Sequence, residues 1–326
     1  MTVALAERYR DRLPLPPGAP VVSLGEGSTP LLPAPRLSER LGVELFLKWE
    51  GANPTGSFKD RGMSVAVSAA LAQGARTVLC ASTGNTAASA AAYARRAGLR
   101  AVVLQPAGAV APGKLAQTCA VGARVLAVRG SFDQALAAAR DLAADGAHVL
   151  VNSLNPHRLH GQKTAAFEIL DDLGGPPDVL ALPYGGGGNT SAYALGFEEA
   201  DVGMPQVLAA EAADRRATTA SAIRIGHPAH RASVEEVVER SRGAVVSLPD
   251  SAILAAWRSI AELEGIFCEP SSAAGIAALA KERPRGARVV CVLTGHGLKD
   301  AETAAAEAAA PVPVDADVAA IASAIE

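Results

Sequence analysis

The chain has 326 residues, of which 49% are hydrophobic and 19% charged, so it can bury a sizeable core and does not have the composition of a disordered chain. A net charge of −3 implies neither a nucleic-acid surface nor a membrane surface, and no apolar run is long enough to span a bilayer. Aromatic residues make up only 4%, which leaves Ala, Val, Leu and Ile to build a core of helices packed on buried parallel sheets.

Short apolar runs alternate along the chain with Ala-rich helical stretches. Strands are predicted at 75–81, 99–105, 123–128, 148–151, 179–183 and 288–293. Helices are predicted at 87–98, 114–122, 131–145, 161–173 and 189–200. This alternation predicts an α/β fold of parallel sheets with helices on both faces. The first four strands form a compact set over 75–151 and are a candidate subdomain.

The four cysteines and the start of the chain bear on the cellular compartment. No CxxC pair occurs, and Cys80 and Cys291 lie in apolar runs, which favours reduced and mostly buried thiols. Glu7 and Arg8 stand where a signal peptide would need an apolar stretch. We therefore expect a cytoplasmic protein without nucleic-acid or membrane partners.

The stretch N-P-T-G-S-F-K-D-R at 53–61 places one lysine, Lys59, just after a turn and at the start of a predicted helix. Ser57 is a plausible N-cap, which puts Lys59 in the first turn beside the positive helix end. This position disfavours protonation, and an amine must be neutral to form a Schiff base. An isolated helical lysine is usually a solvated surface charge, so this local argument is weak by itself. Phe58 packs behind a bound ring or simply enters the core.

Two polar loops each follow a predicted strand and open a predicted helix. The first contains Ser82, Thr83, Asn85 and Thr86, and the second is Y-G-G-G-G-N at 184–189. Such loops present backbone N–H groups and a helix N-terminus to an anion, and glycines allow close approach, although ordinary turns share this pattern. The second loop is not G-x-G-x-x-G and no acidic residue follows at the expected distance, which argues against a dinucleotide site.

Three further features follow predicted strands or open helices. Asn152, Ser153 and Arg158 come after strand 148–151, and an arginine beside small polar donors suits a phosphate, although it could be a surface cation. Lys114 heads a helix and could add positive charge. Thr294 follows strand 288–293, either as a turn residue or as a ligand-contacting hydroxyl. No metal is expected near His296, since no second ligand lies at a suitable spacing.

In this order these motifs resemble those of the threonine synthase family, within the tryptophan-synthase-β-like group of pyridoxal phosphate enzymes. The resemblance runs from about residue 24 (LGEGSTPLL) to 300 and includes HGQKTAAFEI at 160–169. It implies two domains, each an open, mostly parallel sheet with helices on both faces, and a homodimer. Residues 1–58 and 158–326 would form a large cofactor-binding domain, and 59–157 a small domain closing over the cleft.

The resemblance also implies a role for each candidate residue. Lys59 would carry pyridoxal phosphate as a Schiff base and move protons, and Phe58 would lie beside the ring. The other cofactor contacts would be Asn85 to the phenolic oxygen, Thr294 to the pyridine nitrogen, and Gly185, Gly186, Gly187, Gly188 and Asn189 to the phosphate. Ser82, Thr83 and Thr86 would bind the substrate carboxylate, and Lys114, Asn152, Ser153 and Arg158 a phosphate on the substrate. No metal is implied.

The reaction implied is a γ-elimination and β-addition that turns O-phospho-L-homoserine and water into L-threonine and phosphate. An alternative is a paralogous enzyme of β- or γ-elimination or replacement, such as a dehydratase, acting on another amino acid. Gly186 and Gly187 leave this alternative open, because they stand where the family has Asn-Ala. The segment before Ile223 also looks shorter than in the family. A binding protein that kept the fold without catalysis fits less well, since Lys59 and Thr294 are present.

Overall fold

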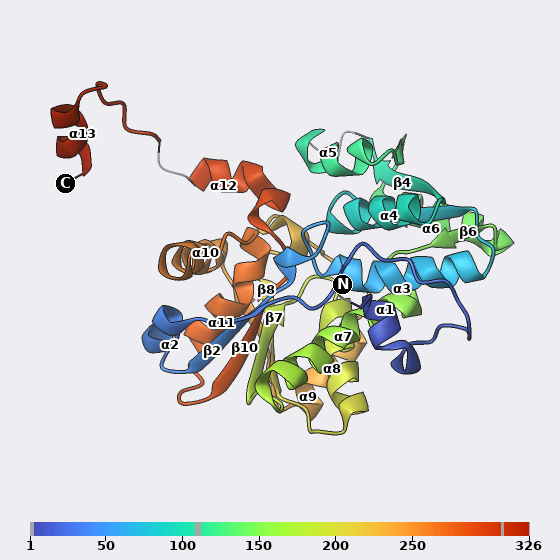
Figure 1. The fold of residues 1–326 in the computed structure, drawn as a ribbon, viewed down its shortest axis with the longest axis horizontal. Coiled ribbons are helices and arrows are strands. Elements are labelled where there is room, and N and C mark those ends of the chain that lie inside the picture. The colour runs from blue at the N-terminus through green and yellow to red at the C-terminus, as the bar shows by residue number, and fades with distance from the viewer. Residues whose placement is uncertain (1–2, 108–111, 308–309, 326) are drawn as a thin grey trace.

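The computed structural model describes residues 3–107, 112–307 and 310–325, which form two β-sheets with helices packed around them (Figure 1). The strands are β1 (Leu31–Pro33), β2 (Glu44–Trp49), β3 (Thr77–Ala81), β4 (Arg100–Pro106), β5 (Arg124–Val128), β6 (His148–Leu150), β7 (Val179–Pro183), β8 (Gln206–Ala212), β9 (Ala244–Leu248) and β10 (Arg288–Leu293).

The α-helices are distributed along the whole chain. They are α1 (Leu5–Arg8), α2 (Pro35–Leu41), α3 (Lys59–Ala72), α4 (Asn85–Arg96), α5 (Pro112–Ala120), α6 (Phe132–Leu142), α7 (Pro156–Leu173), α8 (Gly188–Ala200), α9 (Arg231–Arg240), α10 (Asp250–Glu264), α11 (Ala274–Glu282), α12 (Ala301–Glu307) and α13 (Val318–Ile325).

The larger sheet has the strand order β1-β2-β10-β7-β8-β9, and every pair is parallel except β1 with β2. Its side chains alternate between two apolar layers. Ala181 of β7 faces a cluster with α10 and α11, whereas Leu180 and Leu182 face a cluster with α7 and α8. This alternation is the two-residue period of a strand buried on both faces, and it confirms the predicted α/β class.

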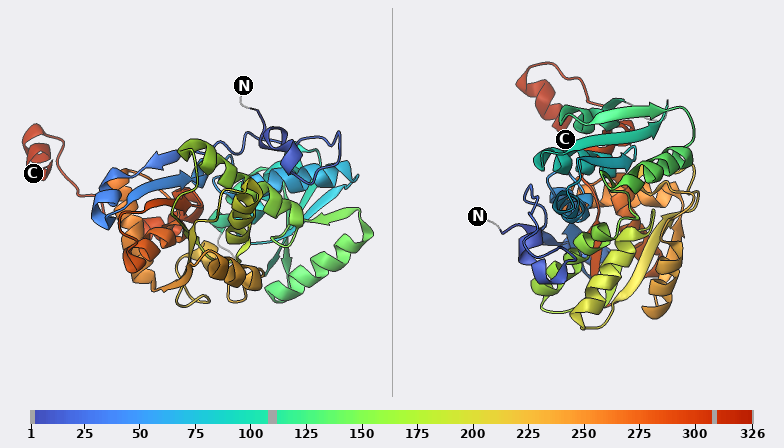
Figure 2. Two further views of the ribbon diagram at one scale, coloured as in Figure 1. Left: turned by 90° about the horizontal axis from the view of Figure 1, so that it is seen from below. Right: turned by 90° about the vertical axis from the view of Figure 1, so that its right-hand side faces the viewer.

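The smaller sheet has the order β5-β4-β3-β6 and is entirely parallel, which confirms that the four strands predicted within 75–151 belong together. Val78 and Cys80 of β3 pack with α4, and Leu104 of β4 packs with α6 on the other face. Helix α3 packs against α4 and against α7, so it lies where the two sheets meet (Figures 1 and 2). The domain bounds 1–58, 59–157 and 158–326 stay a prediction.

Two local expectations were wrong. Helix α7 begins at Pro156, with the Asn155 side chain accepting a hydrogen bond from the His157 N–H at 3.0 Å, so Arg158 lies in a helical first turn and not in a loop. Ser57 does not cap α3: the N-cap position is Phe58, and the buried Ser57 hydroxyl has no hydrogen-bond partner among the residues that the structure describes. The Pro at 156 suits the first position of a helix, a signal that the sequence already carried.

Four strands escaped prediction for identifiable reasons. The Ala-rich strand β8, QVLAAEA, has the composition of a helix as much as of a strand. Strands β1 and β9 are short edge strands with exposed residues. Strand β2, ELFLKW, carries a charged residue near each end. Its Lys48 is completely buried, which composition does not indicate.

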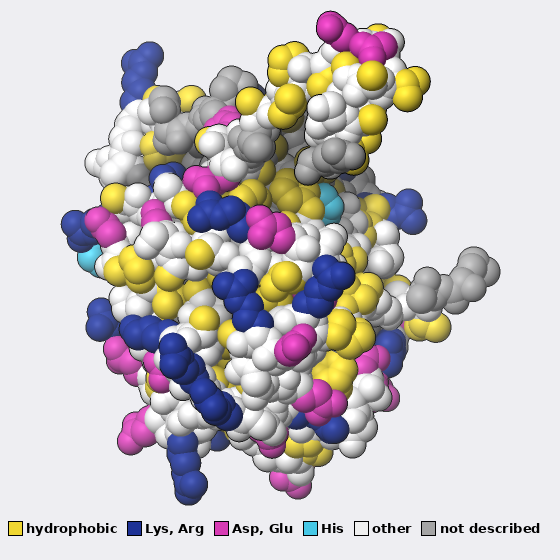
Figure 3. Space-filling view, turned by 90° about the vertical axis from the view of Figure 1, so that its left-hand side faces the viewer, with side chains coloured by type: hydrophobic (Ala, Val, Ile, Leu, Met, Phe, Trp, Pro, Cys, Tyr) yellow, Lys and Arg dark blue, Asp and Glu magenta, His cyan; other side chains and the backbone are white. Residues whose placement is uncertain are grey.

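The surface agrees with the mixed composition. Both basic and acidic side chains occur across the face shown in Figure 3. In the part of the chain that the structure describes, no helix combines the length and apolar character needed to cross a membrane. Cys80, Cys268 and Cys291 are buried and Cys119 is exposed, and all four are free thiols, which confirms the prediction of mostly buried, unpaired cysteines.

Candidate active site

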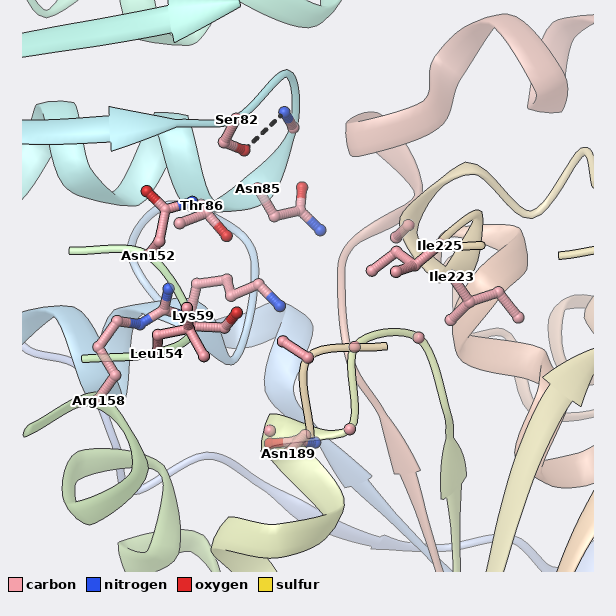
Figure 4. Close-up of a pocket in the computed structure, with 18 of the residues that line it drawn as sticks. Lys59, Ser82, Asn85, Thr86, Asn152, Leu154, Arg158, Asn189, Ile223 and Ile225 are labelled. Carbon is pink, nitrogen blue, oxygen red and sulfur yellow. Dashed lines mark hydrogen bonds between the residues drawn. The ribbon is translucent and has the colours of Figure 1, made fainter. Parts of the chain in front are cut away.

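A cavity of about 820 Å³ lies at the carboxyl ends of strands from both sheets. Helices α3, α4, α7 and α8 all begin at its wall (Figure 4). It brings together nearly all the residues singled out in the sequence: Phe58, Lys59, Ser82, Thr83, Asn85, Thr86, Asn152, Ser153, Arg158, Gly185, Gly186, Gly187, Gly188, Asn189 and Thr294. The exception is Lys114, whose side chain lies outside the described part of the structure.

Lys59 is the first residue of α3, and its side chain reaches into the cavity (Figure 4). The turn before it is tied to the segment after β10, because the Phe58 N–H donates to the Thr294 carbonyl oxygen at 3.0 Å. The Lys59 Nζ lies 3.7 Å from the centre of the Phe58 ring. Burial, reinforced by the positive charge of Arg158, lowers the pKa of Lys59 to about 7. A neutral amine is therefore accessible near neutral pH.

Arg158 is a buried cation without a carboxylate partner in the described part of the chain. It is 1% exposed, its Nη1 donates one hydrogen bond to the Val151 carbonyl oxygen at 3.2 Å, and its Nε has no partner. Burial lowers the pKa of Arg158 to about 10, so the group still carries its charge at neutral pH. A buried charge left unpaired is costly. The arrangement is that of a site prepared for an anion.

The glycine turn at 185–188 leads from β7 into α8. The Gly185 carbonyl accepts from Arg215 Nη1 at 3.1 Å, and the Gly186 carbonyl accepts from the His230 N–H at 3.0 Å. Gly187 has φ +88°, and a Cβ there would lie 2.8 Å from the Val234 side chain, so glycine is required. The turn lines the cavity and leads directly into α8, so its N–H groups and the α8 N-terminus can receive an anion.

Asn189 and Asn85 place two side-chain amides at this cavity. The Asn189 Nδ2 is buried and has no hydrogen-bond partner within the described residues, so it is free to donate a hydrogen bond to a ligand. Asn85 is the first residue of α4, whose N-terminus carries no side-chain cap. Ser82, Thr83 and Thr86 are half-buried around that helix start, with the Ser82 hydroxyl accepting from the Gly84 N–H at 3.2 Å. This end of the cavity can also receive an anionic group.

The Asn152 side chain makes hydrogen bonds within the fold, and Ser153 is anchored through its backbone. The Asn152 amide bonds both backbone groups of Ala81, accepting from its N–H at 2.9 Å and donating to its carbonyl at 2.7 Å. The Ser153 carbonyl lies 3.0 Å from the His230 Nε2. Asn152 therefore braces the end of β3, and its predicted contact with a substrate stays a prediction.

Thr294 directly follows β10, as predicted, and is 5% exposed at the cavity wall. Its hydroxyl lies 3.0 Å from the hydroxyl of Ser272, which also accepts from the Gly295 N–H at 3.0 Å. The Thr294 hydroxyl can therefore donate a hydrogen bond to Ser272, or accept one from it and donate into the cavity. A neutral hydroxyl pair of this kind stabilises an uncharged or weakly basic acceptor.

The sequence reasoning missed several cavity residues. Glu269 lines the wall and accepts a hydrogen bond from Asn85. The loop carrying Ile223 and Ile225 lies across the cavity from Lys59 (Figure 4). Arg140 and Arg224 line the cavity from exposed positions. No local pattern marks these residues, although Glu269 precedes a Pro-Ser-Ser turn that opens a helix, a place where polar groups gather.

The sequence of the chain matches a known protein family and individual known proteins. The sequence profile of the family described as "Pyridoxal-phosphate dependent enzyme" matches residues 22–295. A threonine synthase from Halalkalibacterium halodurans is 49% identical over 320 residues, covering 92% of this chain and 90% of the relative. A threonine synthase from Mycobacterium leprae is 50% identical over 332 residues, covering 94% of this chain and 92% of the relative.

Solved structures share the fold at lower sequence identity. A cysteine synthase from Entamoeba histolytica has a TM-score of 0.76 at 20% identity, covering 88% of this chain and 90% of that one. Maize serine racemase has a TM-score of 0.73 at 23% identity, covering 82% of this chain and 88% of that one. At these identities the likeness concerns the fold alone.

Proposed function

The chain belongs to the pyridoxal-phosphate dependent enzyme family, and we infer that it is a threonine synthase, a lyase that converts O-phospho-L-homoserine and water into L-threonine and phosphate. The observation that carries the inference is identity near one half to threonine synthases over more than nine tenths of the chain. The cavity supports it, because one cavity is lined both by the glycine turn at 185–188, which can receive an anion, and by the buried cation Arg158.

The residues of the cavity fit pyridoxal phosphate. The N–H groups at the start of α8 and the orphaned Asn189 amide would hold its phosphate, and a Cβ at Gly187 could not be accommodated. Lys59 supplies an amine whose pKa of about 7 permits covalent attachment, and Thr294 a hydroxyl for the ring nitrogen. When bound, the cofactor provides an electron sink that stabilises negative charge at the substrate's α-carbon.

Lys59 is the residue placed to move protons. With the substrate bound, the neutral amine of Lys59 could take a proton from the α-carbon and return protons at the neighbouring positions. Burial beside Arg158 keeps the amine from holding its proton too tightly. Both the elimination and the addition of water need such transfers, and the pKa of about 7 at Lys59 suits it to make them.

Arg158 would bind the phosphate that leaves the substrate's γ-carbon. Figure 4 shows Arg158 and Asn189 at separate places around Lys59, which supports separate sites for the leaving phosphate and the cofactor phosphate. Binding a dianion supplies the charge partner that the buried guanidinium lacks. Ser82, Thr83 and Thr86 at the start of α4 would bind the α-carboxylate.

Two parts of the proposal do not follow from the cavity: a homodimer, which rests on the family resemblance, and a cytoplasmic location, which is supported by the free thiols. Light scattering of the purified protein tests the first and fractionation of the native cell the second. A monomer would remove the homodimer without affecting the assignment of the reaction.

The direct test incubates the purified, cofactor-loaded protein with O-phospho-L-homoserine and measures phosphate and threonine together. We expect equal amounts of both. Borohydride reduction followed by peptide mapping should leave the pyridoxyl group on Lys59. Label on another lysine would remove Lys59 from the site, and activity on threonine as a dehydratase substrate without threonine synthesis would sink the reaction assignment.

A further inference from the structure

Glu269 is a buried acid in the cavity wall to which the proposed reaction gives no part. It directly precedes the short helix at Pro270–Ala273, is 3% exposed, and lines the cavity together with Lys59 and Asn85. Its backbone N–H donates to the Gly295 carbonyl oxygen at 2.9 Å, which anchors it to the turn that follows β10.

The Glu269 carboxylate holds the amide of Asn85. The Asn85 Nδ2 lies 3.1 Å from each of the two carboxylate oxygens. Asn85 opens α4 on the smaller sheet, whereas Glu269 belongs to the larger sheet's side of the cavity, so the contact crosses the cleft. It joins two residues separated by 184 positions in the chain.

The space for this carboxylate depends on Gly295. A Cβ at that position would lie 2.5 Å from the Glu269 Oε1, so a side chain there would displace the carboxylate from Asn85. The charged groups around Glu269 are Lys59 from α3 and Lys299 and Asp300 from the turn after β10. Burial raises the pKa of Glu269, while the Asn85 hydrogen bond and the charge of Lys59 act in the opposite direction.

The chemistry of the pair fixes the amide's orientation. An ionised carboxylate only accepts hydrogen bonds, so the Asn85 amide must turn its NH₂ group toward Glu269. A carboxylic acid or a glutamine amide can also donate, and the Asn85 amide could then face it either way round. Only the ionised acid therefore imposes one arrangement on the side of Asn85 that faces the cavity.

We propose that Glu269 is a positioning residue whose carboxylate fixes the Asn85 amide, so that the second Asn85 N–H is available to the ring oxygen of the bound cofactor. The proposal rests on the proposed function for its cofactor and not for its substrate. It assigns to Glu269 neither a proton transfer nor a contact with the reacting carbons.

The test is an absorbance titration of the cofactor-loaded full chain, which reports the apparent pKa of the bound chromophore without any turnover. Loss of one oriented hydrogen bond should shift that pKa by about half a unit to one unit. Glu269→Gln, which keeps the size of the side chain, and Asn85→Ala should shift it in the same direction. The double variant should show no further shift, because both changes remove the same contact.

Two further variants protect the test against trivial outcomes. Glu264→Gln alters an acid that accepts from the Leu37 N–H at 2.7 Å and does not line the cavity, and it should titrate like the wild type. If Glu269→Gln fails to fold, Gly295→Ala displaces the same carboxylate and should give the same shift.

A wild-type titration in Glu269→Gln or in Asn85→Ala, or additive shifts in the double variant, would overturn the inference. The product assay separates this from the proposed function. Threonine synthesis with an unshifted titration defeats the role of Glu269 alone, whereas the expected shifts without threonine synthesis defeat the reaction and leave Glu269 in place.

Discussion

Arg61 and Arg158 are both buried guanidinium groups near α3, yet their surroundings are opposite. Arg61 is 0% exposed and bonds Glu50 and Glu168 on several atoms, with Nη2 at 2.8 Å and 2.6 Å from their oxygens. Arg158, at 1% exposed, donates one hydrogen bond to a backbone carbonyl, and its Nε has no hydrogen-bond partner among the described residues. A buried cation whose hydrogen bonds and charge are fully paired holds the fold together, whereas a buried cation without such partners is available for a ligand.

The pKa directions express the same difference. Burial alone would lower the pKa of Arg61, but the charges of Glu168 and Glu50 outweigh it and raise that pKa well above its usual value. At Arg158 burial has no comparable opposition, and the pKa falls to about 10. Lys48 completes the balanced cluster around Arg61, with its Nζ 2.9 Å from Glu168. The four tests below probe this contrast, from the largest expected effect to the smallest.

Arg61→Met should lower the free energy of unfolding by about 3–5 kcal/mol, because it leaves Glu50 and Glu168 buried without their partner. Urea denaturation measures the change. Arg288→Met is the matched control, since its pair with Glu44 is exposed and is worth about 1 kcal/mol or less. Equal losses of unfolding free energy in the two variants would show that the buried cluster stabilises the fold no more than an exposed ion pair does.

Arg158→Met should act on catalysis and not on stability. Losing a charged hydrogen bond to a phosphate costs about 1.5–3 kcal/mol, so kcat/KM for O-phospho-L-homoserine should fall at least about tenfold. The free energy of unfolding should stay the same or rise, because an unpaired buried charge is removed. A loss of stability like that of Arg61→Met, with activity intact, would reverse the comparison.

Covalent attachment of the cofactor should depend on pH through Lys59. Its lowered pKa of about 7 means that the reactive neutral amine predominates above that pH and is lost below it. The rate of attachment to cofactor-free protein should fall about tenfold per pH unit below the midpoint. Stopped-flow absorbance measures the rate, and a midpoint near the ordinary lysine pKa would show that the Arg158 charge and burial have little effect on Lys59.

Thr294→Ala should have the smallest effect, because one neutral hydrogen bond is worth about 0.5–1.5 kcal/mol. Turnover should fall more than cofactor retention, since in the proposed site the glycine turn would hold the cofactor phosphate independently of Thr294. Equilibrium dialysis gives retention and initial rates give turnover. Ser272→Ala is the companion variant, because its hydroxyl lies 3.0 Å from that of Thr294. Wild-type turnover in Thr294→Ala would remove that residue from the site.

The comparison also separates what could be foreseen from what could not. Lys59 and the glycines at 185–188 were identifiable because a turn, a glycine run and a helix start are neighbours in the chain, and their chemistry follows from local backbone geometry. Arg61 lies two residues from Lys59 within the same motif, and the sequence does not indicate that its role is structural. Its partner Glu168 lies 107 positions away, so only folding could pair them.

Sequence alone determined the α/β class, the placement of the four-strand sheet and the loops that meet at the cavity, because strand and helix periods and turn chemistry are short-range properties. Tertiary structure alone decided that Arg158 stays unpaired, that Asn152 braces β3 and that Glu269 holds Asn85 from 184 positions away. Those facts concern which polar groups are satisfied after burial. Whether a buried polar group finds a hydrogen-bond partner depends on residues far away in the chain and on the exclusion of water, and no local sequence pattern encodes either.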